Sequence, residues 1–160
     1  MNGIGKMKDL KNRKNDERSE AWTRCARELR YVNEAPASLD GLRFYMPSAF
    51  RVAIEKVGCE IWILATTRRG IIDCMPEIVW DEYLELSRAN DFSRKEGQIA
   101  CDPPMKYFVD QPTRTRWTIP SALSAFSKMC GNIETVHLLP EEAFIGIWSA
   151  DRRQKGLSGG

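Results

Sequence analysis

The chain has 160 residues, of which 42% are hydrophobic and 29% are charged, as in an ordinary globular protein. Its formal net charge at pH 7 is only +2, so no large basic field indicates a nucleic-acid partner. Lysine and arginine outnumber the acidic residues mainly within residues 1–30. This length favours one compact domain or two small interlocked halves.

The cysteines and the apolar runs point to a reducing compartment and to a chain without a membrane span. The cysteines number five and show no CxxC spacing, so we predict reduced core residues and neither a disulfide framework nor a zinc site. No apolar segment follows the basic N-terminus, as it would in a signal peptide. The longest apolar run, Ile61–Ala65, is far shorter than a membrane helix. We therefore expect a cytoplasmic protein without membrane contact.

The N-terminal segment differs from the rest of the chain. Residues 1–17 are rich in lysine, asparagine and aspartate and show no apolar period, which predicts disorder. They are either a solubilising tail or a basic arm attracted to phosphates. Residues with helical spacing predict a short helix over Ser19–Arg30. We assign residues 1–28 to a flexible basic extension.

One sequence pattern occurs twice. Arg43–Ala49 and Arg116–Ala122 each begin with a basic residue and a short aromatic run, followed by Pro-Ser-Ala. The proline suits the first turn of a helix. Gly58 and Gly131, separated by the same distance as the two patterns, suit helix C-caps. A strand-to-helix junction that occurs twice predicts a duplicated fold unit.

The flanking segments complete the predicted unit as strand, strand, helix, strand, strand. Arg30–Pro36 and Lys106–Pro112 share a base, a tyrosine, an acid and a proline, and we align them as the first strands. This alignment predicts a longer loop after the first strand in the first copy. β-branched and apolar runs after each glycine predict the remaining strands, namely 61–64 and 71–75 in the first copy and 133–139 and 144–148 in the second.

These elements divide the chain into five segments. A helix that begins at Pro76-Glu77 and extends to Ala89 connects the two copies. The predicted boundaries are 1–28 for the extension, 29–75 for the first copy, 76–104 for the connecting helix and linker, 105–152 for the second copy and 153–160 for a flexible tail.

The duplicated order, together with a Pro-Glu helix carrying Trp80 between the copies, resembles the bacterial MraZ proteins of the SpoVT/AbrB-like superfamily. The resemblance covers Leu29–Arg152. It implies an α+β fold, in which the duplicated β-β-α-β-β unit forms a swapped-hairpin barrel within one chain. It also implies assembly of a homo-oligomeric ring and DNA binding as a transcriptional regulator associated with the nucleoid.

The family pattern in each repeat is acid-x-x-x-Arg-x-x-x-Pro. The chain keeps Arg-x-x-x-Pro at Arg43–Pro47 and at Arg116–Pro120. It departs from the pattern at the acid. Asp110 stands too far before Arg116, although Arg114 follows it at the family spacing. In the first copy, either Glu34, by the repeat alignment, or Asp40, by the resemblance, takes the acid position.

The guanidinium group of arginine suits phosphates and the guanine edge because it can donate two hydrogen bonds at once. We therefore expect Arg43, Arg114 and Arg116 to contact double-stranded DNA, oriented by the acids. Alternatively, Arg43 and Arg116 pair with a nearby acid and merely hold the hairpins, and the two roles are compatible. Further contacts to the DNA backbone are expected from Arg30, Lys106 and Arg51.

Little in the sequence indicates an enzyme. The one histidine, His137, lies in an apolar run that predicts a strand, and a pair with Cys130 lacks a third group. We expect no catalytic residue, metal, cofactor or small-molecule substrate. We expect Tyr45, Trp62, Trp117 and Trp148 in the core or at a subunit interface, rather than as base-stacking platforms. The alternative function is an AbrB-fold scaffold that binds a protein partner, as antitoxin-like proteins do.

Overall fold

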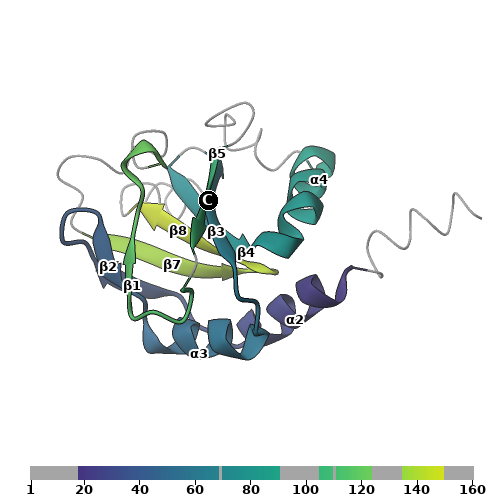
Figure 1. The fold of residues 1–160 in the computed structure, drawn as a ribbon, viewed down its shortest axis with the longest axis horizontal. Helices are drawn as coiled ribbons and strands as arrows, with labels where there is room; N and C mark the ends of the chain where they lie inside the picture. Colours follow the sequence, from purple (N-terminus) through teal and green to yellow (C-terminus); the bar gives the residue numbers. More distant parts are fainter. Residues whose placement is uncertain (1–17, 69, 91–104, 110, 124–134, 150–160) are drawn as a thin grey trace, which may run out of the picture.

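A computed structural model describes residues 18–68, 70–90, 105–109, 111–123 and 135–149 (Figure 1). The helices are α2 (Glu20–Leu29), α3 (Ser48–Val57) and α4 (Trp80–Asn90), with the short 3-10 helix η1 (Glu77–Val79) before α4. The strands are β1 (Ala35–Ser38), β2 (Arg43–Tyr45), β3 (Trp62–Arg68), β4 (Ile71–Pro76), β5 (Met105–Val109), β6 (Arg116–Thr118), β7 (Thr135–Glu141) and β8 (Phe144–Ser149).

The fold is mixed α+β, with antiparallel strand pairing throughout the described residues. Six strands form one sheet in the order β1-β7-β8-β4-β3-β5, and β2 pairs separately with β6 (Figure 1). The large sheet ends at β1 on one side and at β5 on the other. The expected barrel is therefore not a closed one, because the described strands form two hydrogen-bonded sheets with free edges.

The strand order has the symmetry expected of a duplicated unit. Strands β1 to β4 of the first copy correspond in order to strands β5 to β8 of the second. When each strand is replaced by its counterpart, the order of the large sheet is the same order read backwards. The first strand of each copy pairs with the third strand of the other, β1 with β7 and β5 with β3. The second strands pair with each other, as do β4 and β8. In the second copy, the described part of the helix is residues 121–123.

The predicted first strand was wrong in position. It was placed at Arg30–Pro36, but β1 begins at Ala35, and Arg30 caps the C-terminus of α2. Ser38 lies opposite Thr135, the first residue of β7, as Val109 lies opposite Trp62, the first residue of β3.

The two first strands are therefore equivalent in a register that the repeat alignment missed. The loop to the second strand spans residues 39–42 in the first copy and 110–115 in the second, so the longer loop belongs to the second copy. The shared proline misled the alignment. Pro36 lies inside β1, where an edge strand tolerates its missing N–H.

Helix α2 corrects the predicted N-terminal boundary. The short helix expected over Ser19–Arg30 is present, and the Ser19 hydroxyl accepts a hydrogen bond from the backbone N–H of Trp22 at 3.2 Å. Trp22, Cys25 and Leu29 are buried, so this part of the supposed flexible extension belongs to the core. The helix lies beside α3 (Figure 1), and Nη1 of Arg24 donates to the carbonyl oxygen of Val57 at 3.1 Å. Residues 1–17 and 153–160 lie outside the described residues.

Helix α3 has the predicted ends. Pro47 is its N-cap residue, and Gly58 caps its C-terminus with a φ of 77°, a left-handed conformation that glycine adopts without strain. Phe50, Ala53, Ile54 and Val57 form its buried face, which packs into the common core. Gly131 lies outside the described residues.

The connecting helix also follows the prediction. Pro76 precedes η1, and α4 continues to Asn90. Trp80 stacks on Tyr83 with ring centroids 5.7 Å apart, and the hydroxyl of Tyr83 donates to the buried carboxylate of Asp73. The helix thereby joins the core through its aromatic face. None of the described helices has the length and apolar character needed to cross a membrane.

Candidate nucleic-acid interface

Strands β2 and β6 form a two-stranded antiparallel unit, which we call the ribbon. Arg43 lies opposite Thr118, and Tyr45 lies opposite Arg116. The central pair, Phe44 and Trp117, points inward and is only 1% and 3% exposed. Because side chains alternate along a strand, the other residues share the opposite face. This outward face consists of Arg43, Tyr45, Arg116 and Thr118, all of which are exposed.

Backbone hydrogen bonds fix both ends of the ribbon. At one end, the N–H of Ile119 donates to the carbonyl oxygen of Leu42 at 2.7 Å. At the other end, the N–H of Met46 donates to the carbonyl oxygen of Thr115 at 2.9 Å. The buried ring of Trp117 adds a third bond, from Nε1 to the carbonyl oxygen of Arg114 at 3.0 Å. The outward face is thus presented by a rigid backbone.

The turns that lead into the two strands differ. Asp40 and Arg43 exchange backbone hydrogen bonds of 2.8 and 3.0 Å across Gly41, whose φ is 65°. A positive φ at the first central position is typical of a type II′ hairpin turn and explains the glycine. In the second copy, the N–H of Arg114 donates to the carbonyl oxygen of Gln111 at 3.0 Å, and Arg114 is exposed.

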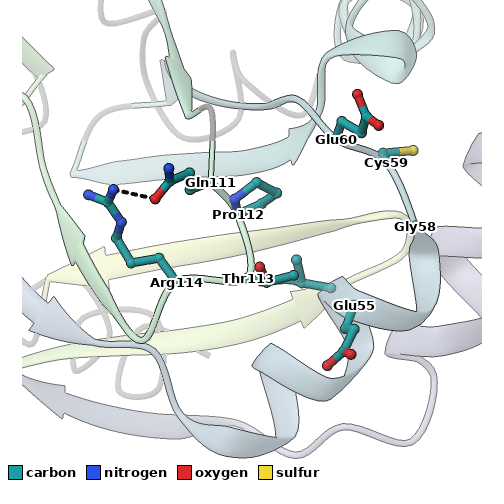
Figure 2. Close-up of a pocket in the computed structure, with 9 residues that line it drawn as sticks. Glu55, Gly58, Cys59, Glu60, Gln111, Pro112, Thr113 and Arg114 are labelled. Atoms are coloured by element: carbon teal, nitrogen blue, oxygen red, sulfur yellow. Dashed lines mark hydrogen bonds between the residues drawn. The ribbon is translucent and has the colours of Figure 1, made fainter.

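Four of the six predicted DNA-contacting residues gather at the ribbon. Arg43 and Arg116 lie on its outward face, and neither forms an ion pair with a carboxylate among the described residues. The guanidinium of Arg116 lies 5.9 Å from the ring centroid of Tyr45. Arg114 donates from Nη2 to Oε1 of Gln111 (Figure 2), and Arg51 of α3 donates from Nη1 to Oγ1 of Thr115 at 3.0 Å.

The other two predicted residues lie elsewhere. Arg30 ends α2, and Nζ of Lys106 lies 5.7 Å from the ring centroid of Trp80 and 5.6 Å from that of Phe108. Neither borders the hollow over the ribbon, which is lined by Arg43, Tyr45, Arg114, Thr115, Arg116 and Thr118.

The acids do not take the predicted positions. Oε2 of Glu34 lies 3.6 Å from Nδ1 of His137, and Asp40 contacts Arg43 through backbone hydrogen bonds alone. The expectation that either acid orients the Arg43 side chain is therefore not met, because Glu34 precedes β1 and faces β7. Asp110 lies outside the described residues. The alternative in which Arg43 and Arg116 serve only as ion-pair partners has no support in the described part of the chain.

A second hollow lies between the end of α3 and the loop before β6. It has a volume of about 540 Å³, and its rim includes Glu55, Cys59 and Glu60 on one side and Gln111 and Arg114 on the other (Figure 2). Its charges are mixed, whereas the outward face of the ribbon carries arginines and no acid. Burial raises the pKa of Cys59, so its thiol is not activated as a nucleophile.

The described residues contain no group of three His, Cys, Asp or Glu side chains placed to hold a metal ion. His137 lies on β7 as expected, and Cys130 lies outside the described residues. Cys25 and Cys74 are buried free thiols.

The sequence prediction missed one residue of the ribbon. Tyr45 was expected in the core or at a subunit interface. It does not lie in the core, because it is 64% exposed and stands beside Arg116, and the interface alternative stays a prediction. The sequence contains a signal for the exposure of Tyr45. Side chains alternate along a strand, so an inward-pointing Phe44 places Arg43 and Tyr45 on the outward face. Trp62 and Trp117 are buried as expected, and Trp148 is partly exposed, with Nε1 donating to Oε2 of Glu141 at 3.2 Å.

No protein-family model matches the chain, and a search of curated proteins finds no match for its sequence.

Proposed function

We propose that this chain is a DNA-binding transcriptional regulator of the MraZ type, which contacts double-stranded DNA through the outward face of the ribbon. The observation that carries the proposal is the position of Arg43 and Arg116. One arginine comes from each copy, both lie on the same exposed face, and neither is neutralised by a carboxylate among the described residues. Free guanidinium groups on a rigid support suit phosphates and the guanine edge.

The shape of the ribbon agrees with this proposal. The major groove of B-DNA is about 12 Å wide and admits a two-stranded β-ribbon. Known β-ribbon proteins insert strands into that groove and recognise bases with outward side chains. In the chain, Arg114 and Arg51 flank the ribbon, where they would contact the phosphate backbone and position it.

The exchange of strands between the copies supports the finer assignment of the fold. A swapped-hairpin, double-AbrB arrangement pairs each repeat with the other, as β1 pairs with β7 and β2 with β6. We further propose a homo-oligomeric ring in the cytoplasm, associated with the nucleoid. Several ribbons acting together would give useful affinity despite a formal net charge of only +2 per chain.

The test is fluorescence anisotropy with a duplex from just upstream of the protein's own gene and a scrambled duplex, each at two salt concentrations. The double variant Arg43→Ala/Arg116→Ala should weaken binding to the upstream duplex by about 30-fold or more, because two arginine contacts of about 1–3 kcal/mol each contribute at least about 2 kcal/mol together. It should also lower the slope of log K against log salt by about 2, one for each phosphate no longer neutralised.

The matched control is Arg27→Ala/Lys56→Ala, which also removes two exposed positive charges but leaves the ribbon intact. It should bind almost as the parent does. A folded chain that binds neither duplex would rule out the regulator. Equal weakening by both double variants would mean that the interaction with DNA is a non-specific charge attraction.

The second candidate is a scaffold that binds a protein partner. It is favoured by the mixed-charge hollow of Glu55, Glu60 and Arg114 and by Phe108, which is 62% exposed on the edge strand β5. Such binding would survive the loss of Arg43 and Arg116, because neither residue lines this hollow. The two candidates therefore give opposite results in the same set of variants.

A further inference from the structure

The ribbon is related to itself by the approximate two-fold symmetry of the duplication, but its two ends carry different side chains. Arg43 and Arg116 are equivalent, and so are Tyr45 and Thr118, because the pairing is symmetric about Phe44 and Trp117. A symmetric site would surround the two arginines alike. This symmetry is broken because Tyr45 on β2 is equivalent to a different residue, Thr118, on β6.

The Arg116 end is supported and strongly basic. The guanidinium of Arg116 lies 5.9 Å from the ring centroid of Tyr45, and Tyr45 lies directly opposite Arg116 in the strand pairing. Arg114 lies two residues before Arg116 and adds a second arginine on the same strand approach, in the hollow that Arg43 also lines. Arg51 reaches this end from α3 through its 3.0 Å hydrogen bond to Thr115.

The Arg43 end lacks an opposing ring and a second arginine two residues earlier. The residue opposite Arg43 is Thr118, which offers no ring for stacking. The residue two positions before Arg43 is Gly41, where the other copy has Arg114. The turn at this end carries the exposed acid Asp40.

We infer that the ribbon binds DNA asymmetrically, with Arg116 as the principal anchor and Tyr45 as the residue that positions it. This inference rests on the proposed function. A guanidinium over an aromatic face keeps its in-plane N–H donors free for a phosphate or a base edge. Stacking also restricts the side chain before binding, which lowers the entropy lost when DNA is bound. Arg43 has neither advantage, so the two equivalent arginines contribute unequally.

The test compares single variants with the same upstream duplex. Arg43→Ala and Arg116→Ala each remove one positive charge from equivalent positions, so they are matched controls for each other. Arg116→Ala should weaken binding more than Arg43→Ala does, by about two- to five-fold, the range expected from an exposed cation–π contact.

A double-mutant cycle isolates the role of Tyr45. Tyr45→Thr, which copies the residue of the second repeat, should weaken binding by about two- to five-fold in the parent and in the Arg43→Ala background. It should have no effect in the Arg116→Ala background, because the partner is absent. Tyr45→Phe keeps the ring and should retain affinity. Thr118→Tyr should strengthen binding through Arg43, because it supplies the ring that Arg43 lacks.

The other possible results distinguish failure of this inference from failure of the proposed DNA binding. Equal losses from the two arginine variants, an undiminished effect of Tyr45→Thr without Arg116, or a loss with Tyr45→Phe would overturn the inference while DNA binding stands. Parent protein that binds no duplex would overturn the proposed function and the inference together. Because Tyr45 is 64% exposed, circular dichroism should show a folded chain for all of its variants.

Discussion

Burial controls the chemistry of the individual cysteines. Desolvation is the main cause that raises the pKa of Cys25 from its ordinary value of 9.0 to about 12, and the nearby Cys59 adds to the shift. Between these two values the unfolded chain loses the proton while the folded chain retains it. The folded state then binds more protons, so the free energy of unfolding falls as the pH rises above about 9.

We therefore predict that Cys25→Ala flattens the pH dependence of stability at alkaline pH. The measurement is urea unfolding in reducing buffer at about pH 8 and about pH 10.5 for the parent and the variant. The variant loses some stability at both values because it leaves a small cavity, so the informative quantity is the difference between the two pH values. An identical difference in both proteins would contradict the assignment of the shift to Cys25.

At the scale of elements, α2 shows how an N-terminal segment becomes part of the core. Ser19 caps the helix, Trp22 and Leu29 are buried, and Arg24 joins the helix to the end of α3. A basic composition suggested a flexible extension to residue 28, but helical spacing of apolar residues was the better guide to residues 20–29. Composition averages over a segment, whereas burial depends on one face of the helix.

We predict that Trp22→Ala lowers the free energy of unfolding by about 3–5 kcal/mol, because the side chain is only 2% exposed and its removal leaves a large cavity. The matched control on the same helix is Arg27→Ala, whose side chain is 64% exposed and which should change stability by less than about 0.5 kcal/mol. Urea unfolding measures both. A small effect of Trp22→Ala would mean that α2 is peripheral to the cooperative core.

At the scale of the whole molecule, strand exchange makes the two copies depend on each other. Each copy supplies the partner of the other copy's first, second and fourth strands, and β4 beside β8 joins the copies at the centre of the sheet. A single copy would leave its β1 or β5 without a neighbour and would expose the inward side of its ribbon strand.

We predict that a fragment of residues 18–90 and a fragment of residues 105–160 are each unfolded alone and fold when mixed. Far-UV circular dichroism and the chemical-shift dispersion of NMR spectra report both states. The intact chain should unfold in one transition, because neither copy has a separate core. A folded spectrum from either fragment alone would show that the exchange of strands is not needed for stability.

The elements whose signals are local could be predicted from the sequence. Pro47 and Gly58 mark the ends of α3, Pro76 precedes the connecting helix, and the repeated pattern marks β2 and β6. Caps, helical spacing and short aromatic runs act within a few residues, so they can be recognised without knowledge of the partner. The arginines of the ribbon were identified in this way.

The partner of each strand could not be predicted from the sequence and is known from the folded chain. Strand pairing is set by contacts between residues far apart in the sequence, and a strand's own pattern does not name its partner. The segment that pairs with β7 is therefore Ala35–Ser38, and the repeat alignment had placed the first strand at Arg30–Pro36. Glu34 consequently lies beside His137 and not near Arg43. The pairing of β2 with β6 places Tyr45 opposite Arg116, and this long-range contact gives the two equivalent arginines different surroundings.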